Sequence, residues 1–175
     1  MRLSLHSLAE RYLYPDQAYN NIDEIDLGAL YTSGIKGLIL DIDNTLIAPG
    51  VKKPDSIMVN WLEAAREAGF DICLLSNASR HRVAGLSSGF GIYAVARASK
   101  PSGMGFLKAM RLLKLGPSQV CVIGDQIFTD ILGARRLGIL ALRIKPITRK
   151  EEPTVVIKRF AEYFILKWYH KTTCI

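Results

Sequence analysis

Two aspartates lie two positions apart directly after a short apolar run. Leu38, Ile39 and Leu40 precede Asp41, and Asp43 follows after one intervening residue. Two carboxylates so close together repel each other unless a cation offsets their charge, and carboxylate oxygens are the hard ligands that Mg²⁺ prefers. The pair therefore indicates a site for a divalent cation. The alternative is that both aspartates only cap the turn that follows the strand.

Further polar side chains follow three later apolar runs, near the points where strands are expected to end. In chain order these residues are Ser76, Asn77, Lys100, Asp125 and Asp130. Each has a structural interpretation of its own, as a turn former, a solvated surface lysine or a helix cap. Because the carboxyl ends of parallel strands meet at one edge of a sheet, we expect all of them to gather around a volume the size of one phosphate.

Apolar runs and helical patterns alternate along the chain with short connections. Strands are expected at about 38–40, 70–75, 92–95, 120–123 and 139–144, and helices at about 54–69, 79–88, 103–114 and 131–137. Five strands alternating with helices are typical of a parallel sheet with right-handed crossovers and helices on both faces. The sequence therefore predicts an α/β fold with a doubly wound sheet of five main strands.

Composition and charge indicate one folded domain with a basic end. The chain has 175 residues, of which 49% are hydrophobic and 22% charged, as in ordinary globular proteins. We expect an N-terminal segment, 1–34, that covers a sheet edge or lies on a membrane surface, with edge cover preferred, then a catalytic core, 35–145, and a C-terminal helix within 146–175. From Arg143 onward eight Lys or Arg face three Glu, so this end carries +5 of the net charge of +7.

The polar residues and their order resemble the haloacid dehalogenase (HAD) superfamily of phosphohydrolases. The matching motifs are Asp41-Ile42-Asp43-Asn44-Thr45, then Ser76, then Lys100, then Gly124-Asp125 with Asp130. More narrowly, Asp-Asn-Thr-Leu and Gly-Asp-Gln-x-x-Thr-Asp are similar to the YqeG-type group of HAD subfamily IIIA. That group is related to HAD-type phosphatidylglycerophosphate phosphatases. The resemblance covers about 35–145 and implies a HAD-like, Rossmann-like fold.

The resemblance also implies a role for each site residue. Asp41 would attack phosphorus and form an aspartyl-phosphate, and Asp43 would protonate the leaving group and later activate water. Substrate phosphate would be bound by Thr45, Ser76, Asn77 and Lys100. Mg²⁺ would be held by the Asp41 carboxylate, the Asp43 backbone carbonyl and the Asp125 carboxylate. Asp130 would orient Lys100 or metal-bound water from behind these ligands.

Short spacings between the motifs leave no room for the cap domain that many HAD enzymes carry. Only 32 residues separate Asp43 from Ser76, and 23 separate Ser76 from Lys100. An open site suits a phosphate on a large partner, and phosphatidylglycerophosphate is the preferred substrate. Alternatives are a soluble nucleotide, a sugar phosphate or a phosphoprotein. An alternative of another class is a nucleic-acid or ribosome-associated protein with a vestigial site, although no specific nucleic-acid motif is present.

The C-terminal end suggests contact with lipid. Residues 154–170 combine apolar, aromatic and basic positions at helical spacing, which is typical of a helix lying in the interface of an anionic bilayer. The alternative is a terminal helix packed on the domain. No run of 18 apolar residues occurs, the N-terminus lacks a secretory h-region, and the three cysteines show no pairing pattern. We expect a cytoplasmic or organellar-matrix location, with peripheral membrane contact or oligomerisation as options.

Overall fold

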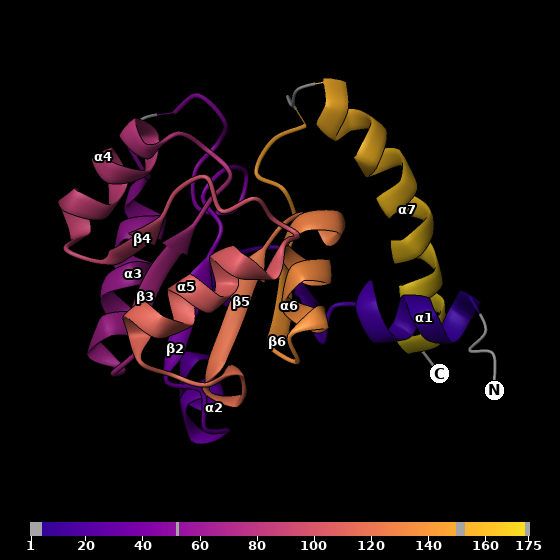
Figure 1. Ribbon diagram of the computed structural model, residues 1–175, viewed down its shortest axis with the longest axis horizontal. Coiled ribbons are helices and arrows are strands. Elements are labelled where there is room, and N and C mark those ends of the chain that lie inside the picture. The colour runs from indigo at the N-terminus through magenta and orange to yellow at the C-terminus, as the bar shows by residue number, and fades with distance from the viewer. Residues whose placement is uncertain (1–4, 52, 150–152, 174–175) are drawn as a thin grey trace.

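The computed structural model describes residues 5–51, 53–149 and 153–173, and its centre is a six-stranded parallel sheet (Figure 1). The strand order across the sheet is β1-β6-β5-β2-β3-β4. In chain order the strands are β1 Gln17–Tyr19, β2 Gly37–Leu40, β3 Asp71–Leu75, β4 Tyr93–Val95, β5 Val120–Gly124 and β6 Leu140–Ile144. All five predicted strands are present, and the predicted doubly wound α/β fold is confirmed.

Strand β2 lies in the middle of the sheet, between β3 and β5. All four of its residues are buried, as expected for a strand covered on both faces, where apolar residues run without polar alternation. Leu40 is level with Leu74 of β3 and with Ile123 of β5. The residues that follow these three strands are therefore delivered to the same edge of the sheet.

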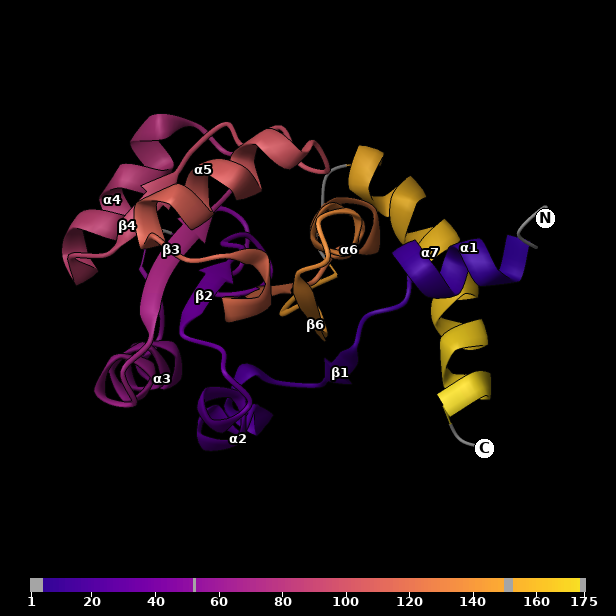
Figure 2. The same cartoon turned by 60° about the horizontal axis from the view of Figure 1, so that its bottom comes forward.

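Helices cover both faces of the sheet and bury two separate cores (Figure 2). The helices are α1 Leu5–Tyr12, α2 Leu27–Thr32, α3 Ser56–Glu67, α4 Arg80–Phe90, α5 Gly103–Leu113, α6 Leu132–Arg136 and α7 Pro153–Thr173, with 3-10 turns at Ile22–Glu24 and Pro117–Gln119. Leu38 and Leu40 face the core built with α2, α3 and α4, whereas Ile39 faces the core built with α5 and α6. This alternation is the two-residue period of a strand.

The helix predicted at 131–137 is present as α6, and the structure adds an element in front of it. A π-helical turn, Ile127–Ile131, precedes α6, and π-helical turns are rare elements that occur often at functional sites. Gly124 ends β5 where a Cβ would come within 2.5 Å of the Asp130 carboxyl carbon. The glycine therefore allows Asp130 to lie directly against the end of the strand.

Strand β1 is a strand that the sequence pattern did not predict. It has only three residues, with Ala18 level with Arg143 of β6, and it lies within the segment expected merely to cover an edge. The Asp16 carboxylate accepts a hydrogen bond of 2.8 Å from the Ala141 N–H, which anchors the start of the strand. The sheet therefore has six strands rather than five. The three residues of β1 are too few to show a strand pattern, and their pairing with β6 is what makes them a strand.

The two ends of the chain pack on each other beside the sheet. Helix α1 crosses α7 (Figures 1 and 2), and the Tyr14 and Tyr169 rings meet edge to face with centroids 5.4 Å apart. Ile165 and Leu166 of α7 pack against the core on the α5 and α6 side. One side of the predicted C-terminal helix therefore packs on the domain. None of the described helices is long and apolar enough to cross a bilayer.

The connections between the motifs hold no added domain. In the described part of the chain, 44–75 without residue 52 contains α3 and β3, and 77–99 contains α4 and β4. Each of these two segments therefore holds one helix and one strand of the sheet domain, as expected for a chain without a large cap domain. The division into 1–34, 35–145 and 146–175 stays a prediction, although Ile22, Ile25 and Leu30 of the first segment are buried in the core of the sheet.

Candidate active site

The ends of four strands surround one open cleft of about 950 Å³ at the carboxyl edge of the sheet. Its lining includes Asp41 after β2, Ser76 and Asn77 after β3, and Lys100 after β4, together with Asp43. Asp125 and Asp130, after β5, lie behind this lining, and both are buried. The structure thus brings together the residues that the sequence pattern placed at one edge.

Lys100 is the buried cation at the centre of the site. Its Nζ lies 2.5 Å from an Asp41 carboxylate oxygen and 2.5 Å from an Asp130 carboxylate oxygen. Burial alone would lower the pKa of Lys100, but the charges of Asp130 and Asp41 outweigh burial and raise its pKa above the usual value. Lys100 therefore stays charged, and it fixes the orientation of the Asp41 side chain.

Asp41 presents one carboxylate oxygen that lacks a hydrogen-bond partner among the described residues. Oδ1 contacts Lys100, whereas Oδ2 is buried without a partner. Burial raises the pKa of Asp41 to about 6, although Lys100 opposes the shift. A buried carboxylate oxygen with no donor is costly, and an incoming cation or electrophile would relieve that cost.

Three buried carboxylates fit a divalent cation. Oxygens of Asp41, Asp125 and Asp130 lie within 4.8 Å of one another, and oxygen ligands of this kind suit a hard divalent ion. Burial, then the charge of Asp41, raises the pKa of Asp125 to about 8. The carboxylates thus disfavour their joint ionisation without a further positive charge, which is the electrostatic condition that a metal ion satisfies.

Asp125 is fixed from two sides. The Thr45 hydroxyl donates to Oδ1 over 3.3 Å, and the Arg159 guanidinium of α7 pairs with Oδ2. Thr45 is therefore directed at a carboxylate in this structure, whereas its predicted contact with substrate phosphate stays a prediction. Asp130 is also held, since the Gln126 N–H donates to its Oδ2 over 3.2 Å.

Asp43 lies at the open side of the cleft rather than among the three buried acids. Its Oδ1 accepts hydrogen bonds of 2.9 and 2.6 Å from Nε and Nη2 of Arg82 on α4. The side chain is one third exposed, so it can exchange protons with water or with a bound molecule. Its backbone carbonyl remains the predicted metal ligand.

Ser76 and Asn77 form the turn that faces Lys100. The Ser76 hydroxyl accepts a hydrogen bond of 3.0 Å from the Ala78 N–H, which leaves its hydroxyl hydrogen to donate elsewhere. The Asn77 side chain accepts from the Lys100 N–H over 2.8 Å and donates to the Lys100 carbonyl over 3.2 Å. Asn77 therefore positions the lysine segment through its side chain, and its predicted use of a backbone N–H toward phosphate stays a prediction.

Helix α7 contributes two site residues that the motifs did not reveal. Arg159 donates to the Asp125 backbone carbonyl over 2.9 Å and pairs with Glu162 over 2.8 Å. The buried Glu162 accepts hydrogen bonds of 2.7 and 3.3 Å from the backbone N–H groups of Ile127 and Phe128. The signal in the sequence is the single acidic residue of an otherwise basic and apolar helix, Glu162, three residues after an Arg. No local pattern identifies their partners 34 and 35 positions earlier.

Comparison with known proteins identifies the family. A model of haloacid dehalogenase-like hydrolases matches residues 50–138. The probable phosphatase YqeG of Bacillus subtilis (strain 168) is 31% identical over 144 residues, which are 82% of this chain and 84% of that protein. Both the motifs and these matches therefore point to the same superfamily.

Two further similarities concern the fold and a related phosphatase. Phosphatidylglycerophosphate phosphatase 1, chloroplastic, from Chlamydomonas reinhardtii is 29% identical over 165 residues, which are 88% of this chain and 61% of that protein. The structure of a predicted HAD-like family hydrolase from Porphyromonas gingivalis aligns with a TM-score of 0.55 at 13% identity, over 73% of this chain and 98% of that one. The chain belongs to the haloacid dehalogenase-like hydrolase family, and within it this protein is a phosphatase similar to YqeG.

Proposed function

We propose that this phosphatase hydrolyses phosphatidylglycerophosphate to phosphatidylglycerol in a Mg²⁺-dependent reaction that passes through an aspartyl-phosphate on Asp41. The observation that carries the covalent step is the Asp41 carboxylate at the floor of the cleft. One of its oxygens is fixed by Lys100 and the other is buried without a hydrogen-bond partner in the described structure. A fixed carboxylate with an available oxygen is the arrangement that nucleophilic attack on phosphorus needs.

The reaction has two steps on the residues of this chain. Asp41 attacks phosphorus, a bond from its carboxylate oxygen to phosphorus forms, and the bond to the leaving alkoxide breaks as Asp43 delivers a proton. Water then attacks the aspartyl-phosphate, Asp43 takes up the water proton, and phosphate and free Asp41 are released. The Arg82 guanidinium occupies Oδ1 of Asp43, so Asp43 has to leave Arg82 before this oxygen can face the leaving group. Substrate phosphate can then become the partner of Arg82.

The remaining side chains hold the phosphoryl group and the nucleophile. Lys100 offsets the charge of Asp41 and of the incoming phosphate, and Asp130 keeps the ammonium group in place. In this proposal the Ser76 hydroxyl and the Asn77 backbone N–H donate hydrogen bonds to phosphoryl oxygens, and Thr45 is a further predicted contact of the phosphate. Positioning and electrostatics of this kind supply most of the acceleration in phosphoryl transfer.

Mg²⁺ is the cation that we assign to the buried carboxylates. Asp41, the Asp43 backbone carbonyl and Asp125 would hold it, with Asp130 behind them, and the cluster of Asp41, Asp125 and Asp130 supports this choice. When bound, Mg²⁺ would offset the charge of the phosphate and orient it for in-line attack.

A phospholipid substrate is supported by three observations. The cleft is open and has no cap in the described segments around it, a relative 29% identical is named a phosphatidylglycerophosphate phosphatase, and the C-terminal end is basic. Because the acyl chains stay in a bilayer, this proposal includes peripheral membrane contact through α7. We assign the reaction to a membrane surface that faces the cytoplasm or an organellar matrix. The relative from Chlamydomonas reinhardtii is a chloroplastic protein, which agrees with the second of these locations.

The test is phosphate release by the purified protein with Mg²⁺ from phosphatidylglycerophosphate in detergent micelles. A panel of nucleotides, sugar phosphates and a phosphopeptide is assayed alongside, with Asp41→Asn as the inactive control. We expect the lipid to give the highest kcat/KM, and acid-quenched wild-type protein to carry phosphate at Asp41. A higher kcat/KM for a soluble phosphomonoester would overturn the lipid assignment. Full activity of Asp41→Asn would overturn the covalent mechanism.

A further inference from the structure

Helix α7 exposes large apolar side chains along the side opposite to its packed face. Ile157 is 73% exposed, Phe160 70%, Phe164 52% and Trp168 56%. The spacings of three and four residues place these side chains on one face of the helix, over a length of about 17 Å. Contiguous exposed apolar surface of this kind marks an interaction site more often than isolated exposed residues do.

The opposite face of α7 is already used by the domain. Glu162 is buried against the π-helical turn, and Tyr169 packs on Tyr14. A partner of α7 therefore meets only the outer apolar face, while the helix axis stays fixed beside the sheet. The partner must accept a helix lying flat on its surface, as the interface of a bilayer does.

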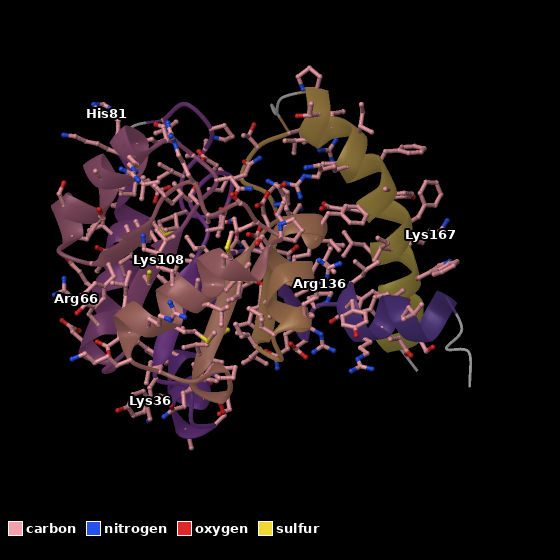
Figure 3. The ribbon with its side chains drawn as sticks, in the orientation of Figure 1. Lys36, Arg66, His81, Lys108, Arg136 and Lys167 are labelled. Carbon is pink, nitrogen blue, oxygen red and sulfur yellow. The ribbon has the colours of Figure 1, made fainter. Side chains whose placement is uncertain are left out.

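Charge selects the kind of surface. Lys158 and Lys167 are exposed on the same helix, and Figure 3 shows Lys167 on the side of α7 that points away from the sheet. The end of the chain from Arg143 onward has a net charge of +5. Aromatic side chains flanked by lysines suit the level of lipid head groups, and the positive charge favours anionic lipid. Two copies of this helix face to face would instead bring like charges together.

The first turns of α7 lie next to the active site. Val155 and Lys158, in the first turns of α7, line the same cleft as Asp41 and Lys100. One turn further along, Arg159 holds Asp125. A bilayer that contacts the outer face of α7 would therefore lie close to the cleft, where a phosphate on a lipid head group could reach Asp41.

We propose that the outer face of α7, formed by Ile157, Phe160, Phe164 and Trp168, inserts into the interface of an anionic phospholipid bilayer and brings the cleft to the height of the head groups. This inference rests on the proposed lipid phosphatase function, which it extends by naming the docking surface. The bilayer is contacted by a helix that lies on its surface, with no part of α7 crossing it.

The experiment measures cosedimentation of the full chain with phosphatidylcholine vesicles that contain or lack phosphatidylglycerol. We expect binding to the anionic vesicles, weaker binding without phosphatidylglycerol, and weakening by salt. Phe160→Ser with Phe164→Ser should reduce binding at least about tenfold, since burial of one Phe side chain contributes about that factor in partitioning. The matched control is Ile57→Ser with Tyr93→Ser, two exposed apolar side chains on α3 and β4, which should bind like wild type.

Fluorescence gives an independent readout of insertion. The chain has two tryptophans, so Trp61→Phe leaves Trp168 as the reporter. We expect the emission of Trp168 to shift to shorter wavelength on addition of anionic vesicles. An unchanged spectrum together with equal sedimentation of the Phe160→Ser, Phe164→Ser variant would overturn the proposal. A wild-type dimer in solution that this variant dissociates would assign the face to a second copy and would also overturn it.

Activity separates failure of the docking proposal from failure of the proposed function. The double Phe variant should hydrolyse a soluble phosphomonoester and detergent-solubilised phosphatidylglycerophosphate like wild type. Its rate of phosphate release should fall at least about tenfold only when the lipid is presented in vesicles. Hydrolysis of the solubilised lipid without vesicle binding would overturn docking and leave the function intact. Vesicle binding without hydrolysis of this lipid in either form would overturn the substrate assignment and leave docking intact.

Discussion

Replacing Arg159 by Met tests whether α7 is part of the active site. In the structure Arg159 pairs with the buried Asp125 and with Glu162 and bonds the Asp125 carbonyl. Met keeps most of the length and the apolar part of the side chain but removes the charge. The variant removes from Asp125 and Glu162 the guanidinium that pairs with both of them, and Arg143 remains as a positive charge near the two carboxylates.

The cost is expected to depend on pH. Burial raises the pKa of Asp125 to about 8, against 3.8 when solvated. Between these values the folded protein keeps a proton on Asp125 that the unfolded chain has lost, so folding stability falls as pH rises toward 8. Without Arg159 the pKa of Asp125 rises further. The free energies of unfolding of wild type and variant therefore differ most above pH 8, and they differ less at a pH where Asp125 is protonated in both proteins. We expect a loss of about 2 kcal/mol at pH 6.5 from the hydrogen bonds to charged groups. The loss grows to about 4 kcal/mol at pH 9, the range for breaking a buried ion pair.

Thermal unfolding in EDTA at the two pH values measures this difference. A domain of this size changes its Tm by about 2–4 °C per kcal/mol, so the deficit should be about 4–8 °C at pH 6.5 and about twice that at pH 9. Lys158→Met, an exposed cation on the same helix, is the matched control and should leave Tm unchanged. Arg159→Met with Glu162→Gln should keep the pH dependence, because Asp125 is still unpaired. A deficit that is equal at both pH values would refute the reasoning.

The other expectations concern the buried charges of the site. Asp41→Asn should lower kcat by at least about 10⁴-fold without lowering Tm, since it removes a carboxylate whose ionisation is unfavourable; retained phosphate release would contradict the nucleophile assignment. Asp43→Asn should lower kcat about 10²–10⁴-fold with a smaller change in KM, measured by steady-state kinetics, and an effect on KM alone would exclude acid and base catalysis. Lys100→Met should cost about 3–5 kcal/mol in chemical denaturation because two buried carboxylates lose their cation; a loss below about 1 kcal/mol would show that the pairs are unimportant. Because the pKa of Asp41 is about 6 and that of Asp125 about 8, cation binding displaces protons below these values. The Mg²⁺ affinity measured by calorimetry should therefore rise up to about tenfold per pH unit per proton between pH 6 and 8, and a pH-independent affinity would count against these ligands.

The core of the fold and the convergence of the motifs could be predicted because their signals are local. Leu38 to Leu40 lack polar alternation, as a central strand requires, and the structure buries all of β2. Asp41, Ser76 and Lys100 follow consecutive strands, so parallel pairing alone brings them to one cleft. The ion pairs of Lys100 with Asp41 and Asp130 follow from that convergence.

Elements whose stability comes from distant partners could not be predicted. Strand β1 is three residues long and is defined by pairing with β6, more than 120 positions later. The turn at Ile127–Ile131 is π-helical, and the Glu162 carboxylate accepts hydrogen bonds from two of its backbone N–H groups. In both cases the local residues allow several conformations, and the long-range hydrogen bonds select one.

By itself, the sequence determined the class of fold, the order of the strands along the chain and the set of acids, hydroxyl and lysine at their ends, because these depend on short-range pattern. Only the tertiary structure decided that Asp43 pairs with Arg82, that Arg159 of α7 holds Asp125, and which face of α7 remains exposed. Those outcomes depend on how helices pack against the sheet. Packing fixes distances between residues far apart in the chain, and no local run of residues encodes such distances.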